Sequence, residues 1–348
     1  MATDSPEKTE GREEQPGFEM IYGLNELPPM GRTVVYGVQW VIIYLPVLMI
    51  FSALGSQVLG LGPEARAEYF QVLLLLAGVT AVLQTLLGHK LPIMDGPALA
   101  VFVTLAAMAP LGLAVMNGGM IIGGFLLLVI GLFGLMRFLG RLITDRVMGV
   151  FLLLLGFTIL PFLLPMFIGV DKAHPNGQPL ILLLSLGLTV LMSIIYHYLK
   201  GVLRSMSIFI GVVLGTLFFT ALGLADFSAV LSAPWLTGPS LPISTWPKFD
   251  LPAMFSFTLA YLALLVNSAG ALYSIEPLVK PKNMSQRFNR GLIFSGLSNM
   301  AAGVLGSIGT VPYASSPGII AVTRVGSRFT LTACGLFLVV MAFLGKIT

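Results

Sequence analysis

Hydrophobic positions run along this chain in long uncharged stretches that are separated by short charged ones. A helix that crosses a bilayer needs about 20 apolar residues, and most of the stretches reach that length. The two longest, 96–136 and 291–323, are interrupted by Pro and Gly at 109–119 and 306–318, so each should hold two segments. The pattern predicts eleven hydrophobic segments, which begin near residues 35, 69, 97, 118, 146, 180, 206, 254, 291, 317 and 329.

The third and tenth segments are too short to span a bilayer as ordinary helices. Both have an extended piece, then Gly and Pro, then a short apolar helix, in KLPIMDGPALAVF (90–102) and GTVPYASSPGIIAVTR (309–324). Irregular backbone at membrane depth lines a cavity or packs on protein, because unpaired amides and carbonyls are costly in lipid. Broken segments at matching places of two halves indicate an inverted-repeat transporter with a site at the mid-plane. The alternative is that Gly and Pro only kink continuous helices.

The ends of these two short helices determine the chemistry of such a site. A helix N-terminus presents free N–H groups and about half a positive charge. Two such ends that face each other form a polar pocket inside an apolar protein. This pocket would suit carbonyl oxygens, or an anionic group, on a small planar solute.

Composition removes several classes of function. Of the 348 residues, 56% are hydrophobic and 10% are charged, with a mean hydropathy of +0.94. These values exclude a soluble enzyme and a disordered chain, and the basic residues are too scattered for a nucleic-acid surface. The single Cys334 excludes an intrachain disulfide framework. No metal-site spacing and no nucleophile with its base occur, so we expect no metal, no cofactor and no enzymatic activity.

Basic residues predict the orientation in the membrane, because Lys and Arg are enriched in cytoplasmic loops. With the N-terminus inside, 15 of the 19 basic residues fall inside and 4 fall outside. The acidic and hydrophilic residues 1–30 lack the shape of a cleaved signal, and we interpret them as a disordered cytoplasmic tail. The expected product is a multi-pass protein of the plasma (inner) membrane with a cytoplasmic N-terminus.

Over about residues 20–348 the chain resembles the nucleobase–ascorbate transporter family, the uracil and xanthine permeases. YGLNELPP (22–29) resembles the stretch before the family's first helix, and LPIMDGPALAVF (91–102) resembles its third-segment motif. Gln39 lies where the family has a Gln-His pair, with Trp40 in place of the His. Further matching stretches follow in the family's order at 147–160, 203–215, 233–255 and 318–328.

The resemblance implies an all-α membrane fold of fourteen segments in two inverted repeats of seven, with short strands before half-helices three and ten. It also implies a homodimer. The chain would hold eleven of these segments, so the second repeat is expected to be incomplete, with gate segments 12–14 absent. The expected parts are a core domain at 31–140 and 254–348, a gate domain at 141–225 and an extracellular loop at 226–253.

The resemblance also implies solute-binding residues, several of which depart from the family's pattern. Segment eight normally carries a Glu that binds the base and, in the uracil permease, a proton-linked His four residues on; here they are Asn267 and Ala271. Segment ten has Ser315 where the family has Gln, Glu or Pro, while Thr323 and Arg324 of its motif are retained. The expected binding residues are Gln39, Gly96, Pro97, Ala98, Leu99, Asn267, Ser315, Ser316 and Gly318.

Each polar candidate also has a structural interpretation. Asn267 has two donors and two acceptors that suit the edge of a heterocycle, but Asn also joins helices within membranes. Gln39 either lines the pocket or bonds to backbone. Ser315 and Ser316 either donate to a solute or cap the tenth half-helix.

Asp95 precedes the short helix of the third segment, and ionisable groups inside membranes are costly and commonly functional. Burial disfavours its charged form, so it is our candidate to carry a proton in place of the missing Glu and His. The alternative is that Asp95 only caps that helix. His89 and His197 are expected at the membrane interface. Close helix packing is expected at Gly119, Gly123, Gly124 and Gly131.

These features predict a secondary transporter for a nucleobase such as uracil or xanthine, coupled to protons and embedded in a lipid bilayer. An anion carrier of the same fold class is one alternative, since the lost segment-eight carboxylate leaves two positive helix ends uncompensated. A non-transporting or truncated relative is another.

Overall fold

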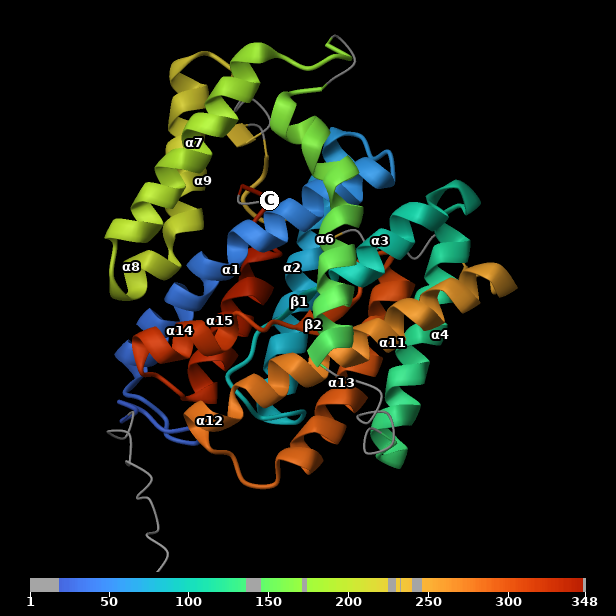
Figure 1. Cartoon of the computed structure of the whole chain (residues 1–348), viewed down its shortest axis with the longest axis vertical. Helices are drawn as coiled ribbons and strands as arrows, with labels where there is room; N and C mark the ends of the chain where they lie inside the picture. Colours follow the sequence, from blue (N-terminus) through green and yellow to red (C-terminus); the bar gives the residue numbers. More distant parts are fainter. Residues whose placement is uncertain are drawn as a thin grey trace, which may run out of the picture.

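The computed structural model describes residues 19–135, 145–170, 174–224, 230–231, 233–239 and 246–346. Regular structure in these residues is almost entirely helical (Figure 1). The longer helices are α1 (Met30–Val58), α2 (Pro63–Leu86), α4 (Leu113–Phe133), α6 (Asp145–Ile168), α7 (Pro179–Tyr198), α9 (Ser207–Ala221), α11 (Leu251–Ser274), α13 (Met284–Leu305) and α15 (Arg328–Met341). The shorter elements are β1 (Asp95–Pro97), α3 (Leu99–Met108), η1 (Ala109–Leu111), α8 (Gly201–Ser205), α12 (Glu276–Val279), β2 (Thr310–Pro312) and α14 (Ser316–Thr323).

Each of the eleven predicted segments corresponds to a helix in this described part of the chain. Five of the described helices are long and apolar enough to cross a membrane by themselves. The interruptions lie at glycines with left-handed backbone, since Gly112 (φ 88°) separates η1 from α4 and Gly306 (φ 69°) ends α13. Such angles favour Gly because it has no Cβ, so these two residues divide the long apolar runs.

The third and tenth segments are half-helices rather than kinked spanning helices. α3 has ten residues and α14 has eight, and each follows a three-residue strand. The strands β1 and β2 pair antiparallel, with Asp95 opposite Pro312, Gly96 opposite Val311 and Pro97 opposite Thr310. The kinked-helix alternative is therefore wrong at both places.

The helices around this two-stranded ribbon pack in a repeated pattern. α13 packs on α4 as α2 packs on α15, and α11 packs on α4 as α1 packs on α15. Segments 1, 2 and 4 of the first half are α1, α2 and α4, and segments 8, 9 and 11 of the second half are α11, α13 and α15. Each contact named above therefore has a matching contact in which every helix is replaced by its counterpart from the other half. The strands β1 and β2 lie near the centre of this arrangement in Figure 1. The fold is thus built from two related halves that meet at the ribbon.

Glycines allow the repeated helix pairs to approach closely. A Cβ on Gly124 of α4 would lie 2.8 Å from the carbonyl oxygen of Gly296 of α13. At the matching contact, a Cβ on Gly78 of α2 would lie 2.7 Å from the carbonyl oxygen of Gly335 of α15. The predicted packing surface on α4 is confirmed, because an added Cβ would collide with a neighbouring helix at Gly119, Gly123, Gly124 and Gly131.

Helices α7, α8 and α9 form a separate group beside the others in Figure 1. α7 packs on α9 and on α6, and α9 packs on α1. No residue of α7 is buried, although the helix is strongly apolar. Much of its apolar surface is therefore available to lipid or to another protein segment.

Candidate functional site

The ribbon holds the N-termini of both half-helices at one place. Beyond the strand pairing, the amide of Ala98 donates to the carbonyl of Gly309, and the amide of Tyr313 donates to the carbonyl of Met94, each at 2.8 Å. All six strand residues are buried. No side chain caps α3 or α14, so the positive end of each helix is not neutralised by a capping oxygen.

A small cavity of about 30 Å³ lies at the N-terminus of α3. It brings together three of the predicted binding residues, Ala98, Leu99 and Asn267. Asn267, on α11, is half-buried there. The space is that of about one water molecule, so a planar solute would enter only if the surrounding helices moved apart. The full lining is Ala98, Leu99, Ala100, Ala263, Leu264, Asn267 and Val311.

Gly96 and Pro97 lie in β1, and both contact the side chain of Tyr313. A Cβ on Gly96 would be 2.6 Å from Oη of Tyr313, and the same hydroxyl donates to the carbonyl of Pro97 at 3.0 Å. Because only Gly leaves room for this ring, Gly96 is required by the packing of Tyr313.

The remaining predicted residues lie away from this cavity. Ser315 and Gly318 are exposed at the start of α14, and Gln39 is half-buried on α1. Ser316 is fully buried, and its Oγ lies 2.6 Å from Oη of Tyr44 and accepts from the amide of Met94 at 3.2 Å. These contacts join α1, the lead into β1 and the start of α14.

An aromatic stack beside Ser316 was not predicted from the sequence. Trp40 and Tyr44 of α1 stack with ring centroids 5.7 Å apart, and Tyr44 stacks on Tyr313 at 5.5 Å. Trp40 occupies the position of the His in the family's Gln-His pair. Its four-residue spacing from Tyr44, which places both on one helix face, is the signal that could have indicated the stack.

The structure corrects the cap interpretation of Asp95, since Asp95 lies in β1 and Ala98 occupies the cap position of α3. His89, which the sequence predicts at the membrane interface, is fully buried within the protein, and its Nε2 lies 3.3 Å from Oδ2 of Asp95. The six-residue separation crosses a non-helical turn between α2 and β1, so no helix or strand period reveals the pair. His197 is exposed on α7.

The retained Thr323 and Arg324 have a structural place at the end of α14. The hydroxyl of Thr323 donates to the carbonyl of Ile319 at 2.9 Å. Arg324 ends the helix with φ 56°, and its carbonyl accepts from the amide of Ile21 at 2.8 Å. The motif thus packs the stretch before α1 against the end of α14.

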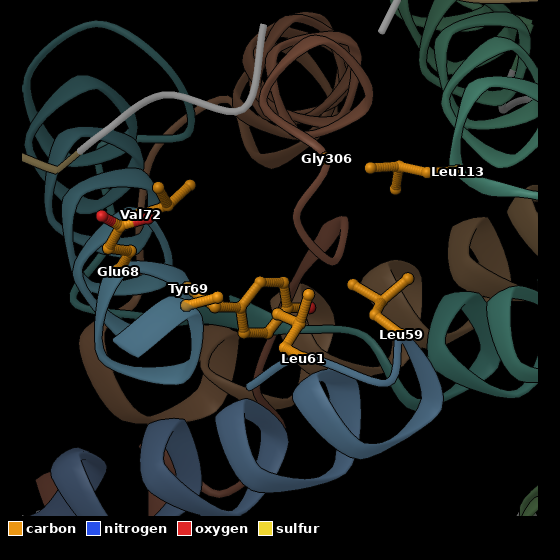
Figure 2. Close-up of a pocket in the computed structure, with 8 residues that line it drawn as sticks. Leu59, Leu61, Glu68, Tyr69, Val72, Leu113 and Gly306 are labelled. Carbon is orange, nitrogen blue, oxygen red and sulfur yellow. The ribbon is translucent and has the colours of Figure 1, made fainter. Parts of the chain in front are cut away.

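A cavity of about 90 Å³ lies among Leu59, Leu61, Tyr69, Leu113 and other residues (Figure 2), and no predicted binding residue lines it. Among the described residues, no three of His, Cys, Asp and Glu are grouped as a metal site would need.

Comparison with known proteins gives one family match and several relatives. The family model described as "Permease family" matches residues 31–348. The chain is 26% identical to a nucleobase transporter of Paenibacillus larvae, over 91% of this chain and 74% of the relative. It is 25% identical to the uracil permease of Escherichia coli K12, over 93% and 74%. It is 24% identical to a uric acid transporter of the same organism, over 91% and 67%.

Among solved structures, the chain is similar to the transmembrane domain of a cyanobacterial bicarbonate transporter, BicA. The TM-score is 0.64, and the match covers 93% of this chain and 88% of the other. At 15% identity this likeness shows the fold alone.

Proposed function

Because the chain belongs to the Permease family that matches residues 31–348, and is therefore a multi-pass membrane transporter and not an enzyme, we propose that it moves a nucleobase. The relatives named above carry nucleobases, uracil or uric acid in their names. A compact planar heterocycle such as uracil or xanthine is accordingly the proposed substrate. We further propose proton-coupled uptake across the plasma membrane, by a homodimer with its N-terminus in the cytoplasm.

The observation that carries this proposal is the placement of Asn267 opposite the uncapped N-terminus of α3. A heterocycle edge has alternating donors and acceptors, which an Asn side chain can match with its two donors and two acceptors. The helix N-terminus would bind a ring carbonyl. The proposed binding residues remain those expected from the sequence, with Ala98, Leu99 and Asn267 as the first contacts.

The small size of the cavity implies that the site must open before a solute can bind. About 30 Å³ is too small for a pyrimidine, so the described conformation would be closed around the site. We propose that a core domain (31–140 and 254–348) moves against a gate domain (141–225) to open it. Within the proposed gate, the group of α7, α8 and α9 packs on α6, α1 and α14 and leaves no residue of α7 buried, which supports a part that can move.

Asp95 supports proton coupling and argues against an anion carrier. Its fully buried carboxyl group lies in the strand that leads to α3. An ionised carboxylate there would offset the positive helix ends and disfavour an anionic solute. When Asp95 binds a proton its carboxyl group becomes uncharged. A neutral base bound beside it would then leave no net charge on the carboxyl group or on the solute.

The first test replaces Asn267 with Ala and measures uptake of radiolabelled uracil, xanthine and uric acid by proteoliposomes. One lost hydrogen bond of about 1.5 kcal/mol would lower uptake at limiting solute about tenfold. The matched control is Ser256→Ala on the same helix, because Ser256 does not line the cavity and its hydroxyl donates to the carbonyl of Pro252 within α11. Competition by sulfate and bicarbonate, with no competition by the bases, would contradict the nucleobase proposal and favour the anion carrier.

The second test replaces Asp95 with Asn and compares two modes of transport. Proton-driven uptake should fail, because the amide cannot bind and release a proton. Counterflow of labelled against unlabelled base should persist, since it needs no net proton movement. If both modes equal those of the unchanged protein, Asp95 is not the coupling group.

A further inference from the structure

His89 is the nearest polar neighbour of the proposed proton carrier. It lies in the turn after α2, and Nε2 of its ring is 3.3 Å from Oδ2 of Asp95, with both side chains fully buried. Gly291 of α13 leaves room for it, since a Cβ there would lie 3.1 Å from the Cβ of His89. The pair is therefore enclosed by α2, β1 and α13 rather than open to lipid or water.

Backbone contacts fix the tautomer of His89. The amide of Leu91 donates to Nδ1 at 3.0 Å, so Nδ1 must present a lone pair. The ring proton of neutral His89 is then on Nε2, from which it donates to Oδ2 of Asp95. A second proton on Nδ1 would point at the amide proton of Leu91. The local backbone thus directs the Nε2–H of His89 at the carboxylate of Asp95.

A cation on α13 holds the backbone of this turn. Nη1 of Arg287 donates to the carbonyls of His89 and Lys90 at 3.1 and 2.9 Å. These two hydrogen bonds fix the turn that carries His89, so the ring is held in place from the backbone side as well.

The other side of Asp95 has no charged neighbour among the described residues. Its surroundings include the phenol groups of Tyr44, from α1, and Tyr313, after β2. Oδ1 of Asp95 is buried and has no hydrogen-bond partner in the described part of the chain. One oxygen of the carboxylate is therefore held by His89, and the other is open to accept a proton.

We propose that His89 is the positioning residue of a proton-binding site at Asp95, in which Oδ1 is the atom that takes up the proton. The step is a simple association: a lone pair of Oδ1 binds a proton, the carboxylate becomes a neutral acid, and His89 keeps its own Nε2 proton throughout. The inference rests on the proton coupling proposed above. It adds that His89 holds the carboxylate and does not relay the proton.

The loss of charge at Asp95 would act directly on the two half-helices. The neighbouring Met94 donates its amide to Ser316 and accepts from the amide of Tyr313. Ser316 begins α14, and Tyr313 lies in the link between β2 and α14. Proton uptake therefore occurs on a piece of backbone that is hydrogen-bonded to the tip of the opposite half-helix.

Two substitutions of His89 distinguish a residue that positions the Asp95 carboxylate from one that passes on the proton. In His89→Asn the side-chain amide reaches the position of Nδ1 and keeps the Leu91 contact, but it lacks the donor to Asp95. In His89→Gln the amide nitrogen reaches the position of Nε2 and keeps that donor, but it cannot titrate. The matched control is His197→Asn, because His197 is exposed on α7.

The measurement is the pH profile of base uptake by proteoliposomes, together with the infrared carboxyl band that disappears in Asp95→Asn. We expect His89→Asn to move both midpoints to higher pH by about one to two units, because a donor to the charged form is lost. His89→Gln and His197→Asn should keep the midpoints of the unchanged protein.

The outcomes that would contradict the role of His89 differ from those that would contradict the role of Asp95. Equal shifts in His89→Asn and His89→Gln, or no shift in either, would overturn the positioning role while leaving Asp95 as the coupling group. An unaltered pH profile in Asp95→Asn would instead remove the proton coupling itself. The infrared band gives an answer even if a variant folds but does not transport.

Discussion

Among single residues, Ser316 has a structural role that its position in the sequence does not reveal. The sequence allowed it to bind solute or to cap α14. In the structure its hydroxyl instead contacts Tyr44 and the amide of Met94. Because all three groups are buried, losing the hydroxyl would leave two of them without this partner.

Replacing Ser316 with Ala should therefore destabilise the protein by about 1–3 kcal/mol, the typical cost of unsatisfied buried polar groups. Thermal unfolding of the purified protein in detergent measures the effect. Ser193→Ala on α7 is the matched control, since Ser193 is exposed and its hydroxyl donates to the carbonyl of Thr189 within the same helix, and its melting temperature should be unchanged. Equal melting temperatures for the two variants would show that the Ser316 contacts are not needed for stability.

At the element scale, close contact between paired helices holds the two halves together. α4 and α13 approach until the backbone of each touches the other at Gly124 and Gly296. A membrane helix pair gains little from the hydrophobic effect, so van der Waals contact between small residues is a main source of its stability. The glycine pattern on α4 made this surface predictable, but the sequence did not identify α13 as the partner.

Replacing Gly124 with Ala should destabilise the α4–α13 contact by about 1–3 kcal/mol, as overpacking does elsewhere. The added Cβ would lie 2.7 Å from the amide nitrogen of Met300, and backbone atoms cannot move aside cheaply. Gly187→Ala on α7 is the control, because nothing lies within 4 Å of its Cβ position and Ala is the better helix former. Thermal unfolding should separate the two, and an equal response would contradict close packing at Gly124.

For the whole molecule, the order of the eleven predicted segments gives a definite expectation for topology. The excess of basic residues on one side predicts a cytoplasmic N-terminus. The order of helices in the described chain then puts Lys282, between α12 and α13, inside and Lys248, before α11, outside. Both side chains are exposed, and the native Cys334 is fully buried.

Single cysteines at these two positions test the orientation in intact cells. Lys248→Cys should react with a membrane-impermeant maleimide, whereas Lys282→Cys should react only after the cells are opened. The unchanged protein is the control, because its buried thiol should stay unlabelled. The reverse labelling pattern would invert the proposed orientation and place the His89–Asp95 pair nearer the outer surface.

Local composition was enough to predict the membrane class, the eleven segments and the two broken ones, because each depends on the length of an apolar run and on where Pro and Gly interrupt it. Resemblance to a family also indicated Leu99 and Asn267 as candidate binding residues, and both line the cavity at the start of α3. Only the tertiary structure shows what Asp95 and Tyr44 contact across the fold. His89 reaches Asp95 through a turn, and Tyr313 reaches Tyr44 through the strand ribbon, and no periodic pattern encodes contacts of that kind.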